Sequence, residues 1–247
     1  MTTQKILQLN VWLGKIEGNL KRFLAQHPYD IICMQEVMSS DDCAEHLGRT
    51  CFSAEQIIAA SGMPYHFFSP NYSYKMADGT AEVGNLILSR TPFVETACEF
   101  AAGSFLSNAI LGKTVQNAWN FQVAKLENGL VVVNHHGYWQ PNPIGNADSV
   151  KSMQRVADYI EPLSKQSPLI MCGDLNVEYA SPAMRPLDFL TDLTHKHQIK
   201  STLSGRTSDG DVACDHILLD SQVQATEFAV RSELVSDHLA VEATIKF

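Results

Sequence analysis

The chain has 247 residues, of which 45% are hydrophobic and 18% are charged, the ordinary balance of a soluble globular protein. A chain of this length buries roughly three-quarters of its unfolded surface, so it needs no metal to fold, and a bound metal is expected to serve chemistry. The 18 basic and 27 acidic residues give a formal net charge of −9, which argues against tight DNA binding and favours small or single-ended substrates.

The N-terminal part of the chain alternates strand and helix patterns. Apolar runs predict strands over residues 5–12 and 29–35, and the second run is nearly continuous, as expected of a strand buried on both faces. Helical spacing of apolar residues predicts helices over residues 17–26 and 44–60.

The middle of the chain has a pattern of strands and turns. Strands are predicted over residues 65–69, 83–89, 93–100, 115–126 and 130–134. The last two are expected to form a hairpin, because Asn128-Gly129 supplies the positive φ that a tight turn needs.

The C-terminal part returns to alternating elements. Helices are predicted over 148–163 and 187–197, with a short buried strand over 169–172, and strands over 213–219, 225–230 and 239–245. No linker separates domains, and each half contains a strand, a helix and a buried strand that leads into an acidic motif. We therefore expect one domain over residues 1–247, with two stacked sheets and helices on the outer faces.

The six cysteines form no C-x-x-C pair and no zinc-site spacing. Cys33, Cys172 and Cys214 lie in apolar runs and are interpreted as small buried hydrophobic residues. Cys43 and Cys51 would pair only in an oxidising compartment, which the absence of an export signal disfavours. Since no apolar run approaches the ~18 residues of a membrane span, a cytoplasmic protein is expected.

Polar clusters interrupt or follow the apolar strands. They read QLNVW at 8–12, CMQEV at 33–37, VVNHHG at 132–137, IMCGDLN at 170–176 and SDH at 236–238. Because active sites of layered folds form at strand ends, five such clusters in one chain indicate a shared site.

The ordered set LNVW, QEV, NHHG, GDLN and SDH resembles the endonuclease/exonuclease/phosphatase superfamily, which includes deoxyribonuclease I-like nucleases, tyrosyl-DNA phosphodiesterases, sphingomyelinases and deadenylases. The resemblance covers residues 8–238. It implies an α+β fold, a four-layer αββα sandwich with two mixed sheets packed face to face. It also implies a hydrolase that uses Mg²⁺, with Mn²⁺ as a substitute.

The resemblance assigns the metal to three residues. Glu36, after an apolar run, is the implied principal Mg²⁺ ligand, and a carboxylate placed there is costly unless a cation compensates it. Asn10 and Asp237 are implied to bind the metal or its water. A strand-end Glu and a turn Asn are the structural alternatives for Glu36 and Asn10.

The catalytic roles fall on two further motifs. Residues i and i+2 of an extended chain point to one side, so Asp174 and Asn176 can face one phosphate. By resemblance, Asp174 orients and deprotonates the attacking water, and Asn176 holds the water or a phosphoryl oxygen. His238 is implied to stabilise charge on the phosphate, with Asp215 as its carboxylate partner. The family form at this last position is Asp-Tyr, so His216 is a departure whose role stays open.

The pair His135-His136 requires a choice. The family form Asn-Thr-His-Leu aligns His136 with the catalytic histidine, a phosphate contact or leaving-group acid, and leaves His135 on the opposite face as a packing residue. Glu82 matches the acidic residue that orients this histidine, although a solvent-facing Glu before a strand is equally ordinary. Asn85 is expected to face the cleft nearby.

Substrate contacts are expected from loops beyond the strand ends. Trp139 either stacks on a base, ring or acyl group or packs under the loop that contains Pro141 and Pro143. Arg206 either reaches a phosphate or remains a solvated loop residue.

Three functions remain open on the sequence. The favoured one is a phosphodiesterase or phosphatase with a small or single-ended phosphate ester as substrate. The second is a nuclease, for which nucleic acid is a possible partner that the net charge does not favour. The third is a catalytically silent binding protein, which the filled catalytic positions disfavour. No feature indicates an oligomeric state.

Overall fold

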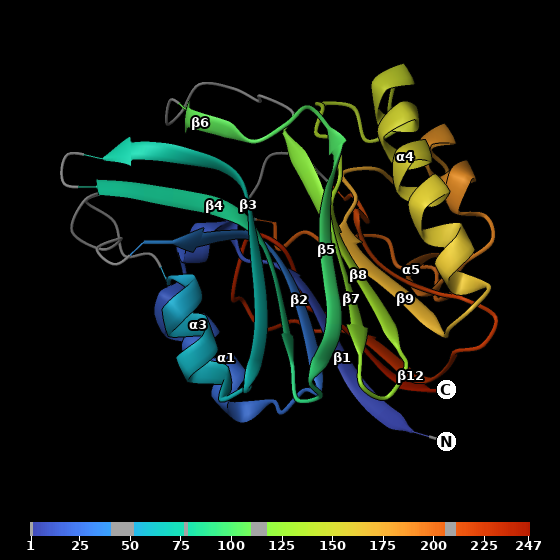
Figure 1. Ribbon diagram of the computed structural model, residues 1–247, viewed down its shortest axis with the longest axis horizontal. Coiled ribbons are helices and arrows are strands. Elements are labelled where there is room, and N and C mark those ends of the chain that lie inside the picture. The colour runs from blue at the N-terminus through green and yellow to red at the C-terminus, as the bar shows by residue number, and fades with distance from the viewer. Residues whose placement is uncertain (1, 41–51, 77–78, 110–117, 206–210) are drawn as a thin grey trace.

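The computed structural model describes residues 2–40, 52–76, 79–109, 118–205 and 211–247 (Figure 1). The predicted substrate contact Arg206, the Cys43–Cys51 pair, residues 44–51 of a predicted helix and residues 115–117 of a predicted strand lie outside these ranges. Within them, no helix is both long enough and apolar enough to cross a bilayer.

Two mixed sheets form the centre of the molecule. One contains β1 (Thr3–Asn10), β2 (Ile31–Ser39), β3 (Tyr65–Met76), β4 (Gly79–Ser89), β6 (Leu106–Ala109), β12 (Gln224–Val230) and β13 (Val241–Lys246). The other contains β5 (Phe93–Ala102), β7 (Trp119–Leu126), β8 (Val131–His136), β9 (Leu169–Asp174), β10 (Thr191–Asp192) and β11 (Asp215–Leu219). Among the described residues the strand orders are β12-β13-β1-β2-β4-β3-β6 and β10-β11-β9-β8-β7-β5.

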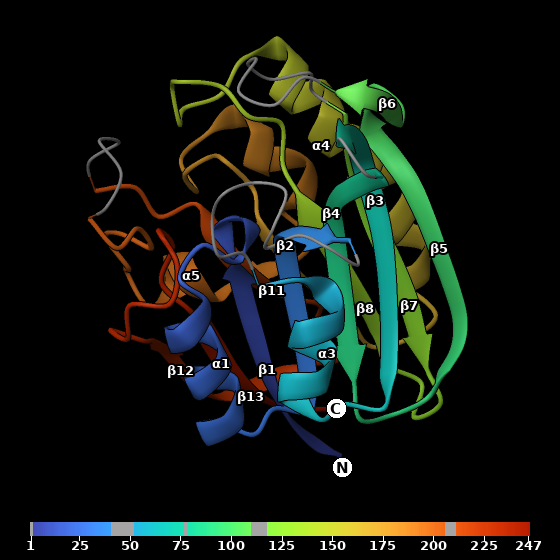
Figure 2. The ribbon, with the colours of Figure 1, turned by 90° about the vertical axis from the view of Figure 1, so that its left-hand side faces the viewer.

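Helices cover the outer faces of both sheets (Figures 1 and 2). Helices α1 (Glu17–Gln26) and α3 (Ala54–Ser61) pack on the first sheet through a core that includes Leu9, Phe23 and Ile57. Helix α4 (Ala147–Ser164) packs on the second sheet through Val133 and Val156, among others. This arrangement confirms the predicted αββα sandwich.

The space between the sheets changes character along the strands. In β1, β2, β8 and β9 alternate residues face this space, as the period of two requires. From one end to the other these residues are Ile6, Gln8 and Asn10; Ile31, Cys33 and Gln35; Val132, Asn134 and His136; and Ile170, Cys172 and Asp174. The first residue of each series, together with Cys33 and Cys172, belongs to an apolar core between the sheets, and polar side chains follow toward the other end. The sandwich therefore has an apolar end and a polar end.

A layer of buried amides joins the two sheets between these ends. Gln8 and Gln35 exchange two side-chain hydrogen bonds of 2.6 and 2.9 Å, and Gln35 also donates to Oδ1 of Asn134 at 2.6 Å. Asn134 in turn donates to the side chain of Gln122 at 2.9 Å. We call these four residues the amide layer. Because buried amides are costly unless they are paired, the layer ties one sheet to the other.

One predicted helix, over residues 187–197, is wrong. The segment contains the end of a 3-10 helix (Pro182–Leu187), then β10 and the short helix α5 (Leu193–Lys196). Asp192 interrupts the helical pattern, because its strand pairs with β11 and its side chain accepts hydrogen bonds from the N–H groups of Thr194 and His195. Tertiary pairing thus overrides the local spacing of apolar residues.

Other boundaries differ in length. Strand β3 extends beyond the predicted end at residue 69, with a register shift between Pro70 and Tyr72, and the short strand β6 was not predicted. The hairpin of β7 and β8 is confirmed: the strands pair antiparallel and Gly129 adopts a φ of +90°.

Candidate active site

A pocket of about 240 Å³ lies at the polar end of the sandwich. Its described lining includes acidic, amide, imidazole, thiol and indole side chains from Glu36, Asp174, Asp237, Asn176, His238, Cys214, Trp12 and Trp139. Glu36, Asp174 and His238, which lie far apart in the sequence, therefore converge on one pocket. Asn176 and Asp237 line it as well.

Glu36 reaches the pocket through a bulge in β2. The pairing of β2 with β4 shifts register between Met34 and Val37, and Glu36 adopts a φ of +53°. A bulge bends the strand and redirects a side chain. The strand does not end before Glu36, as the sequence analysis expected, but continues to Ser39.

Positive φ values are concentrated at this pocket. Six non-glycine residues in the described chain have one, and three of them, Trp12, Glu36 and Asn176, line the pocket. Each such conformation costs on the order of 1–3 kcal/mol and persists only where the surrounding structure enforces it. The surrounding structure must therefore enforce these three backbone conformations.

Asn10 lies behind the pocket and connects two of its carboxylates. Its Nδ2 donates to Oε1 of Glu36 at 3.1 Å and to Oδ2 of Asp174 at 2.9 Å, while its Oδ1 accepts from the N–H of Trp12 at 3.0 Å. The side chain is 1% exposed and does not line the pocket. The structure therefore brings Asn10 to the predicted place but engages both ends of its amide with the protein.

Asp174 and Asn176 are joined by a turn, not by an extended chain. Oδ1 of Asp174 accepts from the N–H of Asn176 at 3.0 Å, and Asn176 donates its side-chain amide to the carbonyl of Gly137 at 3.0 Å. A Cβ at Gly137 would lie 2.2 Å from the carbonyl oxygen of Leu175, so only glycine permits this approach. Asp174 and Asn176 both line the pocket as predicted, but a turn brings them there and not an extended strand.

His238 is paired with Asp215 as the sequence analysis expected. Nδ1 of His238 donates to Oδ2 of Asp215 at 2.8 Å, which leaves Nε2 directed at Oδ2 of Asp174, 3.7 Å away. Burial opposes a charge on the ring, but the carboxylates of Asp215 and Asp174 outweigh it and raise the pKa of His238 well above its usual value. His238 is a cation at neutral pH.

Asp215 is itself held by further side chains, among them the thiol of Cys214, whose Sγ lies 3.7 Å from Oδ2. Thr202 donates its hydroxyl to Oδ2 of Asp215 at 2.6 Å, and Gln8 of the amide layer donates to Oδ1 at 3.2 Å. Asp215 is fully buried. The amide layer thereby reaches the His238 side of the site, a connection that the sequence did not predict.

His136 is buried beside Asp174 and stays neutral. Burial lowers the pKa of His136 to about 4, and its Nε2 lies 3.6 Å from Oδ2 of Asp174. Its ring packs against Trp119 with the centroids 4.3 Å apart. The predicted Glu82–His136 pair is not formed, because Nδ1 of His136 has no hydrogen-bond partner in the described structure.

His135 and Asn85 are packing residues in the structure. His135 is fully buried, with Nδ1 3.1 Å from the carbonyl oxygen of Asn120, as expected for the opposite face of the strand. Asn85 is also fully buried, and its amide donates to both oxygens of Asn120 at 3.0 and 2.9 Å. The expectation that Asn85 faces the cleft is therefore corrected: its side chain points between the sheets.

His216 is part of a separate buried ion pair. Its Nδ1 lies 2.8 Å from Oδ2 of Asp192, and its Nε2 lies 3.0 Å from the carbonyl oxygen of Val177. Because both ring nitrogens face acceptors, both carry protons, and the ring is a cation. The histidine that departs from the family's Asp-Tyr form thus anchors β11 to Asp192.

Two indoles border the pocket. Trp139 is 38% exposed and lines the pocket together with Pro141 and Pro143. Trp12, from the LNVW motif, lines it as well, and the ammonium of Lys15 lies 3.9 Å from the centroid of its ring. Trp12 and Cys214 were not predicted as site residues, although Trp12 belongs to the LNVW motif.

The charges of the lining fit a hard divalent cation. Burial raises the pKa of Glu36, and the nearby carboxylates of Asp237 and Asp174 raise it further. Burial likewise raises the pKa of Asp237. The described lining holds three carboxylates and no Lys or Arg. The cationic His238 and, for Asp237, the ammonium of Lys15 only partly offset this negative charge, so Glu36 and Asp237 offer oxygen ligands that suit a divalent cation.

Comparison with known proteins places the chain in a family. The sequence profile of the Endonuclease/Exonuclease/phosphatase family matches residues 7–238. The chain belongs to this family, whose members are phosphoric ester hydrolases that generally depend on a divalent metal. No sequence among the curated proteins compared with the chain matches it.

Solved structures share the fold over the whole chain. A family member from Bacteroides vulgatus is 18% identical with a TM-score of 0.69, and both chains are covered completely. A mannosyl-6-phosphatase from Bacteroides thetaiotaomicron is 15% identical with a TM-score of 0.67, over 98% of this chain and 99% of that one. TDP2 from D. rerio, complexed with a single strand DNA product, is 15% identical with a TM-score of 0.66, with both chains covered completely.

Proposed function

We propose that this protein is a Mg²⁺-dependent phosphohydrolase that cleaves a small or single-ended phosphate ester by direct attack of water. The observation that carries the proposal is the convergence of Glu36, Asp174 and His238 on one pocket. A metal-ligand carboxylate, a proton acceptor and a cation there face a common space of about 240 Å³. No covalent nucleophile is required.

Glu36 and Asp237 would hold the metal. When bound, Mg²⁺ would polarise a phosphoryl oxygen and offset the negative charge of the carboxylates. Asn10 acts as a positioning residue, since it donates to both Glu36 and Asp174 and fixes the distance between them.

The water would be activated by Asp174. One oxygen of this carboxylate is occupied by the N–H of Asn176, so the carboxylate is held in one orientation. Its other oxygen faces the two histidine rings. Asp174 accepts the proton of the attacking water, and the amide of Asn176 helps to orient that water or a phosphoryl oxygen.

The two histidines take different parts. His238 is cationic and stabilises negative charge on the phosphoryl oxygens as the reaction proceeds. His136 lies behind the described pocket lining and is neutral because of its burial, so it would reach a phosphate as a hydrogen-bond donor and would not serve as the leaving-group acid. The sequence left two roles open for His136, a phosphate contact and a leaving-group acid, and the phosphate contact is therefore favoured.

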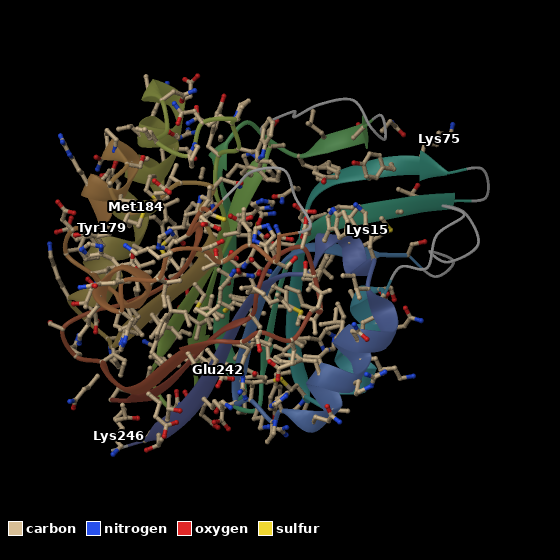
Figure 3. All side chains as sticks on the ribbon, turned by 180° about the vertical axis from the view of Figure 1, so that it is seen from behind. Lys15, Lys75, Tyr179, Met184, Glu242 and Lys246 are labelled. Carbon is tan, nitrogen blue, oxygen red and sulfur yellow. The ribbon has the colours of Figure 1, made fainter. Side chains whose placement is uncertain are left out.

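The lining supports a small or single-ended substrate. Long nucleic acid is usually gripped by Lys and Arg contacts to many phosphates, and the described pocket lining contains neither residue. Two of the exposed lysines, Lys75 and Lys246, lie at opposite ends of the molecule (Figure 3).

A second candidate is cleavage at the end of a nucleic-acid strand. The half-exposed indole of Trp139 at the pocket favours it, because a base next to the scissile phosphate would stack there. The D. rerio TDP2 structure with a single strand DNA product supports the same candidate by its shared fold.

A substrate panel tests these candidates. Metal-free protein is assayed with and without Mg²⁺ on bis(p-nitrophenyl) phosphate, p-nitrophenyl phosphate, single-stranded oligonucleotides and plasmid. Metal-dependent hydrolysis of the small esters is expected, and Asp174→Asn and His238→Ala should each lower turnover by about 10²-fold or more. Turnover that is unchanged in both variants would contradict the assigned roles, and strong salt-sensitive plasmid nicking would favour a nuclease.

A further inference from the structure

A thiol lies among the oxygen and nitrogen atoms of the site. Cys214 lines the pocket beside Asp174 and His238, and one ligand atom from each of these residues lies within 4.8 Å of the others. Sγ of Cys214 lies 3.7 Å from Oδ2 of Asp215, and the proposed hydrolysis assigns the thiol no chemical step, so Cys214 is a metal-binding type of side chain without a catalytic role.

The histidine of this cluster is already oriented as a metal ligand. Asp215 holds Nδ1 of His238 at 2.8 Å, which leaves Nε2 directed at Asp174. A carboxylate on the far nitrogen is the usual outer partner of a zinc-binding histidine, since it fixes the ring and raises its basicity. Thr202 and Gln8 fix this carboxylate in turn.

The cluster discriminates between metals by their chemistry. Mg²⁺ prefers oxygen ligands and gains little from sulfur, whereas Zn²⁺ binds thiolate, imidazole and carboxylate in one tetrahedral shell. Cys214 is 5% exposed, and an ion that takes this place must displace two protons to solvent, the thiol proton of Cys214 and the Nε2 proton of the cationic His238. Glu36 and Asp237 would bind Mg²⁺, whereas the thiolate of Cys214 would favour Zn²⁺ at the neighbouring cluster.

We propose that Asp174, Cys214 and His238 form a site for a soft divalent cation such as Zn²⁺, with a fourth position open to the pocket, and that an ion bound there blocks hydrolysis. Three protein ligands and one open position are a common arrangement for zinc. The inhibitory part rests on the proposed function, because the ion would occupy the side chains that activate water and contact phosphate. The binding part does not.

The test measures binding separately from turnover. A background variant with Cys43, Cys51 and Cys98 replaced by serine leaves Cys33, Cys172 and Cys214 as the thiols. This protein is titrated with Co²⁺, which gives a thiolate-to-metal charge-transfer absorption, and the bound Co²⁺ is then displaced with Zn²⁺. Cys214→Ser is compared with Cys172→Ser, a control at a thiol that is also buried but does not line the pocket.

The expected result is a charge-transfer band in the background protein and in Cys172→Ser, lost in Cys214→Ser. Zn²⁺ affinity should fall about tenfold or more in Cys214→Ser, and half-inhibition of Mg²⁺-dependent turnover should need correspondingly more Zn²⁺, each variant referred to its own Zn²⁺-free rate. An unchanged band or affinity in Cys214→Ser would overturn the site. Circular dichroism checks folding, with Cys214→Ala as the replacement if the serine variant does not fold. If no ester is hydrolysed at all, the proposed function fails while the Co²⁺ titration still decides the site.

Discussion

Oδ2 of Asp215 accepts hydrogen bonds from both Nδ1 of His238, at 2.8 Å, and the hydroxyl of Thr202, at 2.6 Å. Because Asp215 is fully buried, its charge acts on His238 with little screening by solvent. This relationship makes Asp215 the residue that keeps His238 protonated and fixes the direction of its ring.

Replacing Asp215 with Asn should therefore lower the pKa of His238 while keeping an acceptor for its Nδ1–H. A rate that needs protonated His238 declines as pH rises through this pKa, so the decline should move to lower pH. At neutral pH, kcat/KM should fall by about tenfold or more. The pH profile of kcat/KM measures both effects, with the exposed Asp158→Asn on α4 as control; coincident profiles for wild type and Asp215→Asn would contradict the role.

Glu36→Gln should separate stability from metal binding. Removing one of three carboxylates relieves like-charge repulsion, so the metal-free variant should be at least as stable as wild type. Mg²⁺ at about 100 times its Kd should stabilise wild type by about 2.7 kcal/mol, a Tm increase of roughly 5–10 °C for a chain of this size. Thermal unfolding with and without Mg²⁺ checks this. Glu95→Gln, an exposed carboxylate on β5, should retain the full increase, and an equal increase in Glu36→Gln would rule out Glu36 as a ligand.

The amide layer predicts a strongly non-additive pair of substitutions. Gln8→Leu and Gln35→Leu each leave the buried amide oxygen of the other glutamine without its donor, and each should lower the free energy of unfolding by about 1–3 kcal/mol. The double variant removes both members of the exchanged pair, so its loss in the free energy of unfolding should be smaller than the sum of the two single losses. Urea unfolding of the four proteins gives the coupling energy, which should be about 1 kcal/mol or more. Simple additivity would show that the two side chains do not depend on each other.

The His216–Asp192 pair predicts an alkaline loss of stability. Burial opposes the charge on His216, but Asp192 and the carbonyl of Val177 outweigh it and raise its pKa. Since the folded pKa lies above the unfolded value of about 6.5, this stabilisation is complete below that value and is lost as pH rises through the folded pKa.

Urea unfolding as a function of pH, for wild type and His216→Gln, tests this prediction. The variant should be less stable by about 3 kcal/mol at about pH 6, because Asp192 keeps its buried charge without a cationic partner. The difference between the two proteins should shrink at higher pH. A difference that is constant through this range would mean that His216 is neutral in the folded protein.

The sequence predicted the sheets well because alternation and apolar runs are local signals. It located Asp174, Asn176, Asp237 and His238 because these follow short motifs with fixed order. It could not foresee the bulge at Glu36, since the extra residue is defined by the pairing of β2 with β4 and not by β2 alone. The prediction of a helix over residues 187–197 was wrong for a related reason, because Asp192 pairs with His216 on β11.

Side-chain pairs across the sandwich were the least predictable part. Glu82 and His136 were matched by motif, but His136 instead lies between Trp119 and Asp174. Asn85 directly follows Gly84 in a strand near the site, and only the packing of the two sheets shows that its side chain points between them. Gln8 gave no local signal of its contact with Asp215, which is 207 positions further along the chain.

The amide layer also determines how accurately the two sheets are aligned. Apolar side chains between two sheets tolerate small sliding movements, because dispersion contacts have little directionality. Hydrogen bonds between fixed amides accept one alignment only. Asn10 and Glu36 come from one sheet and Asp174 and Asp215 from the other, so a displacement of one sheet by a fraction of an ångström would separate the halves of the site long before the sandwich came apart.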